Sequence, residues 1–98
     1  MFKISEVYLK TIKEYEESPD GSQQLVSRKA YLPRDGLLNQ DYVVAVYKHE
    51  FTSSMDLQML SHFPKSTKFC RLVLNGHSFR SSEIIVVGSF TKLQEMLQ

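Results

Sequence analysis

Three histidines are the first residues to consider as metal ligands or as acid–base groups. His49 ends an apolar run beside Glu50, His62 lies near the end of a predicted helix, and His77 follows an Asn-Gly pair. No two of them have the i, i+4 spacing or the His/Cys pairing that zinc sites usually show. We therefore expect no metal site and no cofactor.

The single cysteine, Cys70, is the second candidate for chemistry, as a nucleophile. It lies in a predicted strand with Leu72 and Leu74, and alternation places all three side chains on one face. Free cysteines in such positions usually act as small buried hydrophobic residues. His77 lies on the predicted partner strand, but a thiol between large apolar residues is a poor nucleophile. The sequence therefore predicts an inert thiol.

Four carboxylates are candidates for acid–base catalysis: Asp35, Asp41, Glu50 and Glu83. All lie at predicted turns or strand ends, where Asp and Glu are common because they form local hydrogen bonds. The chain has no GxSxG motif, no P-loop and no GxGxxG motif. We expect no catalytic residues and a protein that is not an enzyme.

Basic residues gather in two segments. They are Arg28, Lys29 and Arg34 in the first, and Lys65, Lys68, Arg71 and Arg80 in the second. If Asn75 and Gly76 form a two-residue turn, Arg71 lies opposite Arg80, and the two like charges repel unless an anion lies between them. This arrangement favours a phosphate, nucleic-acid or acidic protein ligand. The alternative is a charged sheet edge that prevents aggregation.

Exposed apolar residues favour a protein partner. Leu37 and Leu38 occur in a segment rich in turn-forming residues, and the chain has five tyrosines. Tyrosine and arginine are enriched at the residues that dominate binding energy in protein interfaces. The alternative is that the two leucines cover an open end of the core.

Residues 4–16 have the apolar spacing of a helix rather than that of a strand. An acidic stretch from Glu14 to Asp20 would end this helix, where acidic residues oppose the helix dipole. This stretch would serve a basic partner or keep the chain soluble. The alternative is a hairpin, because the sequence SPDG at 18–21 is a good turn with proline at its second position.

Four segments rich in β-branched and aromatic residues are predicted strands: 23–32, 42–48, 68–74 and 83–88. Residues 33–36 should end the first, and Asn75-Gly76 should form a type I′ turn that folds residues 77–79 back against residues 72–74. One helix should cover residues 55–63, with Ser53 or Ser54 as its N-cap, and the last helix should begin near Thr91. We predict an α+β fold with a four-stranded, mostly antiparallel sheet and two or three short helices packed mainly on one face.

The second half of the chain repeats one order of elements. Residues 42–60 (YVVAVYKHEFTSSMDLQML) and 84–97 (IIVVGSFTKLQEML) each contain an apolar strand, Phe-Thr and an amphipathic segment. Each is preceded by a strand and a turn, so 23–63 and 68–97 are predicted pseudo-repeats, with Phe51 and Phe90 in equivalent core positions.

Length and composition limit the class of protein. The 98 residues suit a single globular domain, 1–98, and a net charge of +1 excludes a strongly basic chain but not a local basic patch. One cysteine fits a reducing compartment, and no run has membrane-spanning length or resembles a signal peptide. We predict a cytoplasmic protein, and the two ends of the sequence suggest a complete small gene product.

Together these features predict a small non-enzymatic protein that docks onto another protein or protein complex. Its size suits an accessory subunit or an inhibitor of the kind that phages and mobile elements encode. The alternative is nucleic-acid binding by the basic hairpin around residues 65–80. An unpaired edge strand could also build a homodimer. The predicted binding residues lie on two turns: Arg71, His77 and Arg80 on one, and Arg34, Leu37 and Leu38 on the other.

Overall fold

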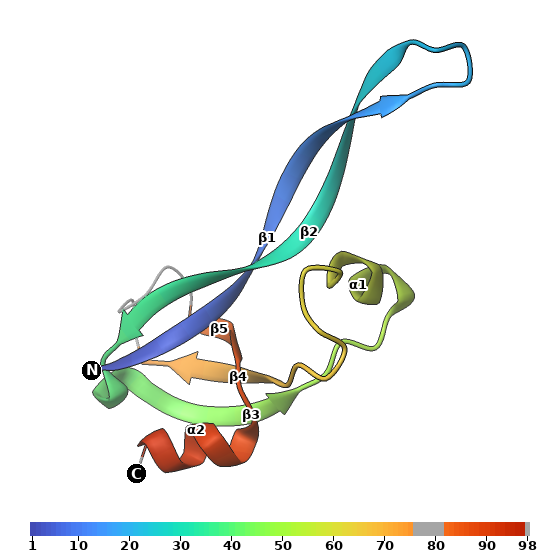
Figure 1. The fold of residues 1–98 in the computed structure, drawn as a ribbon. Helices are drawn as coiled ribbons and strands as arrows, with labels where there is room; N and C mark the ends of the chain where they lie inside the picture. Colours follow the sequence, from blue (N-terminus) through green and yellow to red (C-terminus); the bar gives the residue numbers. More distant parts are fainter. Residues whose placement is uncertain (76–81, 98) are drawn as a thin grey trace.

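The computed structural model describes residues 1–75 and 82–97. The described elements are β1 (Phe2–Glu17), β2 (Gln23–Leu38), η1 (Gln40–Tyr42), β3 (Val43–His49), α1 (Ser54–Met59), β4 (Phe69–Leu74), β5 (Glu83–Val87) and α2 (Phe90–Leu97). The strands form one sheet in the order β2-β1-β5-β4-β3, and all its neighbouring strands are antiparallel (Figure 1). The fold is therefore α+β with a mostly antiparallel sheet, as predicted, but with five strands instead of four.

The additional strand is β1. It includes residues 4–16, for which a helix was predicted, so that prediction is wrong. β1 pairs with β2 along its whole length, from Phe2 opposite Leu38 to Glu17 opposite Gln23. In the hairpin, alternate residues of β1 pair their backbone groups with β2, the outward-facing groups are left to water, and cross-strand contacts between side chains are gained. The SPDG turn, which supported the hairpin alternative, joins the two strands.

β2 is longer than predicted, because it continues through Pro33 and Gly36 to Leu38. β2 is an edge strand that pairs with β1. An edge strand tolerates proline because one of its sides makes no ladder hydrogen bonds. The turn predicted over Arg34 to Leu38 is therefore wrong, and these residues belong to a strand.

The core lies on one face of the sheet. In β4, buried and half-buried residues alternate, so that Cys70, Leu72 and Leu74 all point to the core face. β5 adds Ile84 and Val86, and the other members of the buried cluster are Ile4, Leu38 and Leu93. The alternation that predicted an inward Cys70 is thus confirmed.

The two helices relate differently to this core. Leu93 brings α2 into the core, and Ser89 caps this helix, since its Oγ accepts a hydrogen bond of 3.2 Å from the Lys92 backbone N–H. α1 is shorter than the predicted 55–63 and has no buried residue, but its predicted cap, Ser53, is confirmed by a 3.1 Å hydrogen bond from the Asp56 N–H. Neither described helix is long and apolar enough to cross a membrane.

The register between β4 and β5 excludes the predicted two-residue turn at Asn75-Gly76. Leu72 lies opposite Ile84 and Val73 opposite Glu83, whereas the predicted turn would place residues 77–79 there. The connection is therefore longer than two residues, and residues 76–81 lie outside the described part of the chain. Packing Ile84 and Val86 into the core selects this register over the one that the turn sequence favours.

The order strand, strand, helix does occur twice, as β2, β3, α1 and then β4, β5, α2. The pairing differs between the two units, because β4 and β5 are neighbours whereas β2 and β3 form the two edges of the sheet. The superposition of 23–63 on 68–97, with Phe51 on Phe90, stays a prediction.

Candidate docking surfaces

Arg71, the first predicted binding residue, already has partners within the sheet. Its Nη1 lies 3.3 Å from Oε1 of Glu83, and its guanidinium lies 4.7 Å from the centre of the Tyr47 ring. In the register Arg71 is opposite Ile85, so the predicted pairing with Arg80 is wrong. His77 and Arg80 themselves lie outside the described residues.

Arg34 is also held by its own sheet. Its Nη2 lies 3.2 Å from Oε2 of Glu6, and its guanidinium lies 4.4 Å from the centre of the Tyr8 ring. Only 12% of the Glu6 side chain is exposed, so this ion pair is less screened by water than the others in the described structure. A partner would have to displace these contacts to use Arg34.

The two predicted leucines point to opposite sides of β2. Leu38 is buried in the core, whereas Leu37 is 63% exposed. The suggestion that both cover an open end of the core therefore holds for Leu38 only. Of the four predicted site residues that the structure describes, Leu37 alone offers an exposed apolar side chain.

A different surface is more prominent, namely the outer part of the β1–β2 hairpin. Within the described residues, β5 pairs with β1 at Glu6 and Val7 only, so the hairpin continues beyond the sheet as a two-stranded ribbon. Figure 1 shows this ribbon projecting away from β3, β4 and α2, and the molecule measures 58 × 27 × 20 Å. We call residues 11–29 the arm and residues 14–26 its tip.

The tip exposes two large apolar side chains. Tyr15 lies opposite Leu25 in the register, so both project from the same face of the ribbon. Tyr15 is 72% exposed and Leu25 is 56% exposed. Among the described residues, no core covers this part of the ribbon, so pairing across the strands removes little of their apolar surface from water. Both side chains therefore remain available to another surface.

The turn that closes the arm is fixed by a network around Asp20. Oδ1 of Asp20 accepts hydrogen bonds from the hydroxyls of Ser18 (2.5 Å) and Ser22 (2.6 Å) and from the Ser22 backbone N–H (2.9 Å). Gly21 has φ of 85°, a conformation that glycine adopts without strain. The hydrogen bonds from Ser18 and Ser22 stabilise the carboxylate and lower the pKa of Asp20 to about 2.

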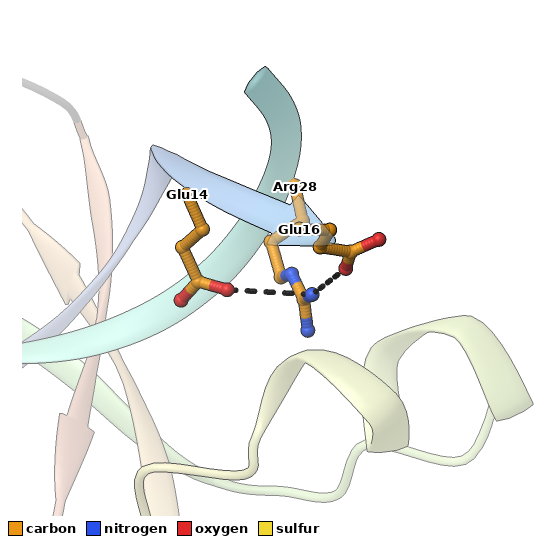
Figure 2. Close-up of polar contacts among 3 residues, drawn as sticks. All are labelled: Glu14, Glu16 and Arg28. Carbon is orange, nitrogen blue, oxygen red and sulfur yellow. Dashed lines mark hydrogen bonds and ion pairs between the residues drawn. The ribbon is translucent and has the colours of Figure 1, made fainter. Parts of the chain in front are cut away.

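The tip is acidic. Residues 14–26 include Glu14, Glu16, Glu17 and Asp20 and no lysine or arginine, which gives a charge of −4. Arg28, just below the tip, reaches toward it, with its Nη2 at 3.3 Å from Oε2 of Glu14 and 2.7 Å from Oε1 of Glu16 (Figure 2). This exposed cation offsets one of the four negative charges, so an excess of carboxylates remains.

A groove of about 870 Å³ lies where the end of β3, the start of β4, the segment after α1 and the start of α2 meet. We call it the aromatic groove, because its described lining includes Phe51, Phe63, Phe69 and Phe90. Phe69 holds two of these rings edge-on, with centroids 5.1 Å from Phe51 and 5.4 Å from Phe63. Such edge-to-face contacts fix the rings in position.

The aromatic groove is also basic. Its described lining includes three lysines, Lys48, Lys65 and Lys68, and one acidic residue, Glu50. The net charge of these four side chains is +2. Two of these lysines belong to the segment 65–80, for which the sequence predicted a basic surface. A surface of this kind suits an acidic ligand with an apolar component.

Tyr31 connects the base of the arm with this region. Its ring lies 5.1 Å from that of Phe51, and its hydroxyl donates a 3.1 Å hydrogen bond to Oδ1 of Asp56 in α1. Burial, and then the neighbouring carboxylate, raise the pKa of Tyr31. The contact holds α1 against β2 and does not place an acid–base pair in an open cleft.

The described residues provide little for covalent or metal chemistry. Cys70 is fully buried, and its Sγ donates to the Gly88 carbonyl at 3.4 Å. Burial raises the pKa of Cys70 and outweighs the opposing effect of Lys48, so the thiol stays protonated at neutral pH. No group of three His, Cys, Asp or Glu side chains in this part of the chain could hold a metal ion.

Sequence reasoning indicated the charge of each surface but missed the projecting arm and the groove. The sequence signal for the arm is the SPDG turn between two runs with β-forming residues, which favours the hairpin alternative. The groove has no local signal, since its rings come from four separate segments. Comparison of the chain with protein families, curated proteins and solved structures found no match.

Proposed function

We propose that this chain is a non-enzymatic, cytoplasmic docking protein that contacts a partner protein with the tip of its arm. The observation that carries the proposal is the exposed pair Tyr15 and Leu25, at 72% and 56%, on a ribbon that extends beyond the sheet. Tyrosine is among the residues that dominate binding energy in protein interfaces, and a neighbouring apolar side chain such as Leu25 helps to exclude water from it. Protein docking is thus the same class of function that the sequence predicts, but the proposed contact surface is the arm instead of the two predicted turns.

The local structure of the arm supports this role. The network around Asp20 fixes the turn, and a ligand segment that is ordered before binding loses less conformational entropy on binding. The acidic residues around the apolar pair favour a basic partner surface and speed the encounter with it. A projecting ribbon of this kind suits an accessory subunit or an inhibitor, the two roles that the size of the chain favours.

The test is capture of partners from native lysate by the immobilised protein. Replacing Tyr15 and Leu25 with threonine keeps β-forming residues in the ribbon and removes the apolar contact, so capture should be lost. The matched control is Leu37→Thr, since Leu37 is similarly exposed at 63% on the opposite end of β2. Capture that survives the arm substitutions but fails with Leu37→Thr would transfer the site to the originally predicted segment.

A second candidate function is binding of single-stranded nucleic acid in the aromatic groove. Lys48, Lys65 and Lys68 lie around phenylalanine rings there, and such sites combine backbone neutralisation with stacking of bases. Nuclease treatment of the lysate and the salt dependence of binding separate the two functions. Nucleic-acid affinity should fall steeply with salt, whereas a mixed apolar and polar protein interface should respond weakly.

A further inference from the structure

We infer that the arm tip of one copy of this chain docks into the aromatic groove of a second copy. This inference rests on the proposed function and names the partner as the protein itself. In Figure 1 the far end of the arm lies well beyond α1, β3, β4 and α2, the elements around the groove, so the tip and groove of one chain do not meet. A tip in the groove must therefore belong to another molecule.

The two surfaces have opposite charge. The tip carries −4, of which Arg28 offsets one, and the described lining of the groove carries +2. In a chain with a net charge of only +1, this separation places an acidic end and a basic end on the same molecule. Opposite potentials raise the rate of encounter and fix the orientation of the two surfaces.

The apolar parts of the two surfaces also match. Tyr15 and Leu25 present an aromatic ring and an aliphatic side chain from one face of the ribbon. The groove offers phenylalanine rings and Leu57, which is 55% exposed. Docking would bury apolar groups of both copies that are exposed in the single chain, and that burial drives association.

A reciprocal arrangement would form this contact twice. If each of two copies places its tip in the groove of the other, the pair closes with twofold symmetry, whereas a one-way contact leaves a tip and a groove open. In both arrangements the contact joins one intact tip with one intact groove, and this property allows a complementation test.

The experiment is sedimentation velocity on the purified, nucleic-acid-free protein from micromolar to near-millimolar concentration. The wild-type protein should self-associate. Reversing the tip charges with Glu16→Lys and Glu17→Lys should weaken association by about tenfold or more, because close opposite charges across interfaces couple strongly. Reversing the groove charges with Lys65→Glu and Lys68→Glu should have the same effect.

An equimolar mixture of these two variants should associate again, since the first retains the groove and the second retains the tip. The negative control is the Lys65→Glu, Lys68→Glu protein with Tyr15→Thr and Leu25→Thr added. It has the same net charge but no intact tip, so its mixture with the tip variant should remain monomeric. Recovery in the first mixture also shows that its two variants are folded, and circular dichroism checks the fold of the four-substitution control.

A further control is the Lys3→Glu, Lys10→Glu protein, which has the charge change of the groove variant at exposed positions elsewhere. It should self-associate like the wild-type protein. A wild-type protein that stays monomeric throughout overturns this inference alone, because the arm could still capture another protein from lysate. Self-association that both variants retain also overturns it, and indicates pairing of edge strands instead.

Discussion

Replacing Leu72 with alanine should lower the free energy of unfolding by about 3–4 kcal/mol. Leu72 is fully buried in the middle of the sheet, with Val46 opposite it on β3 and Ile84 opposite it on β5. Its side chain also belongs to the cluster that Leu93 of α2 covers. The substitution therefore tests whether the core lies where the alternation in β4 and β5 places it.

The magnitude follows from the atoms that are removed. Leucine to alanine removes three carbon atoms, and burial of each contributes about 0.8 kcal/mol, or about 2.4 kcal/mol in total. A cavity remains where the neighbouring strands cannot move together, and measured values for fully buried leucines accordingly reach about 2.7–5.0 kcal/mol. A domain of this length has a total stability of about 5–15 kcal/mol, so the loss is a large fraction of it.

The assay is equilibrium unfolding in urea, followed by circular dichroism, with the free energy taken from the midpoint and slope. The matched control is Leu25→Ala in the arm tip. Leu25 is 56% exposed, so its replacement should change the free energy of unfolding by no more than about 0.5 kcal/mol. A loss below about 1 kcal/mol for Leu72→Ala, or a similar loss at both positions, would refute the division into a buried core and an arm without one.

Two further predictions concern titratable groups. Replacing Ser18 and Ser22 with alanine should raise the pKa of Asp20 from about 2 toward its ordinary value of 3.8. NMR titration of the carboxyl group measures this pKa, and an unchanged value would contradict the turn network. Because the pKa of Asp20 is lowered in the folded state, its carboxylate stabilises the fold above pH 3.8. This stabilisation is lost as the pH falls through about 2. The buried Cys70 thiol, whose pKa is raised, should react with iodoacetamide far more slowly in the native protein than in denaturant, and equal rates would mean that β4 is not covered as described.

The elements whose signals are local can be predicted from the amino-acid sequence alone. The strands β3, β4 and β5 lie within one residue of the predicted segments 42–48, 68–74 and 83–88, because runs of β-branched and aromatic residues favour extended structure. Ser53 caps α1 as predicted, since a serine oxygen can satisfy a free backbone N–H at a helix start. The buried, inert Cys70 followed from the alternation of side chains along one strand.

Which strands are neighbours and which of their faces are covered depends on packing between distant segments. The arm is exposed on both faces, so β1 lacks the alternation that marks a half-buried strand, and its helical spacing was misleading. The register between β4 and β5 is fixed by burial of Ile84 and Val86 and not by Asn75-Gly76. The same burial gives Arg71 a partner in Glu83 and removes the predicted arginine pair.

The candidate site shows the same division. The sequence indicated a basic surface at Lys65 and Lys68 and an acidic stretch from Glu14 to Asp20, because charge is visible residue by residue. That these charges lie in an aromatic groove and on a projecting ribbon depends on contacts between segments far apart in the chain. Contacts of this kind are set by the sum of burial over the whole sheet, which no local window of sequence contains.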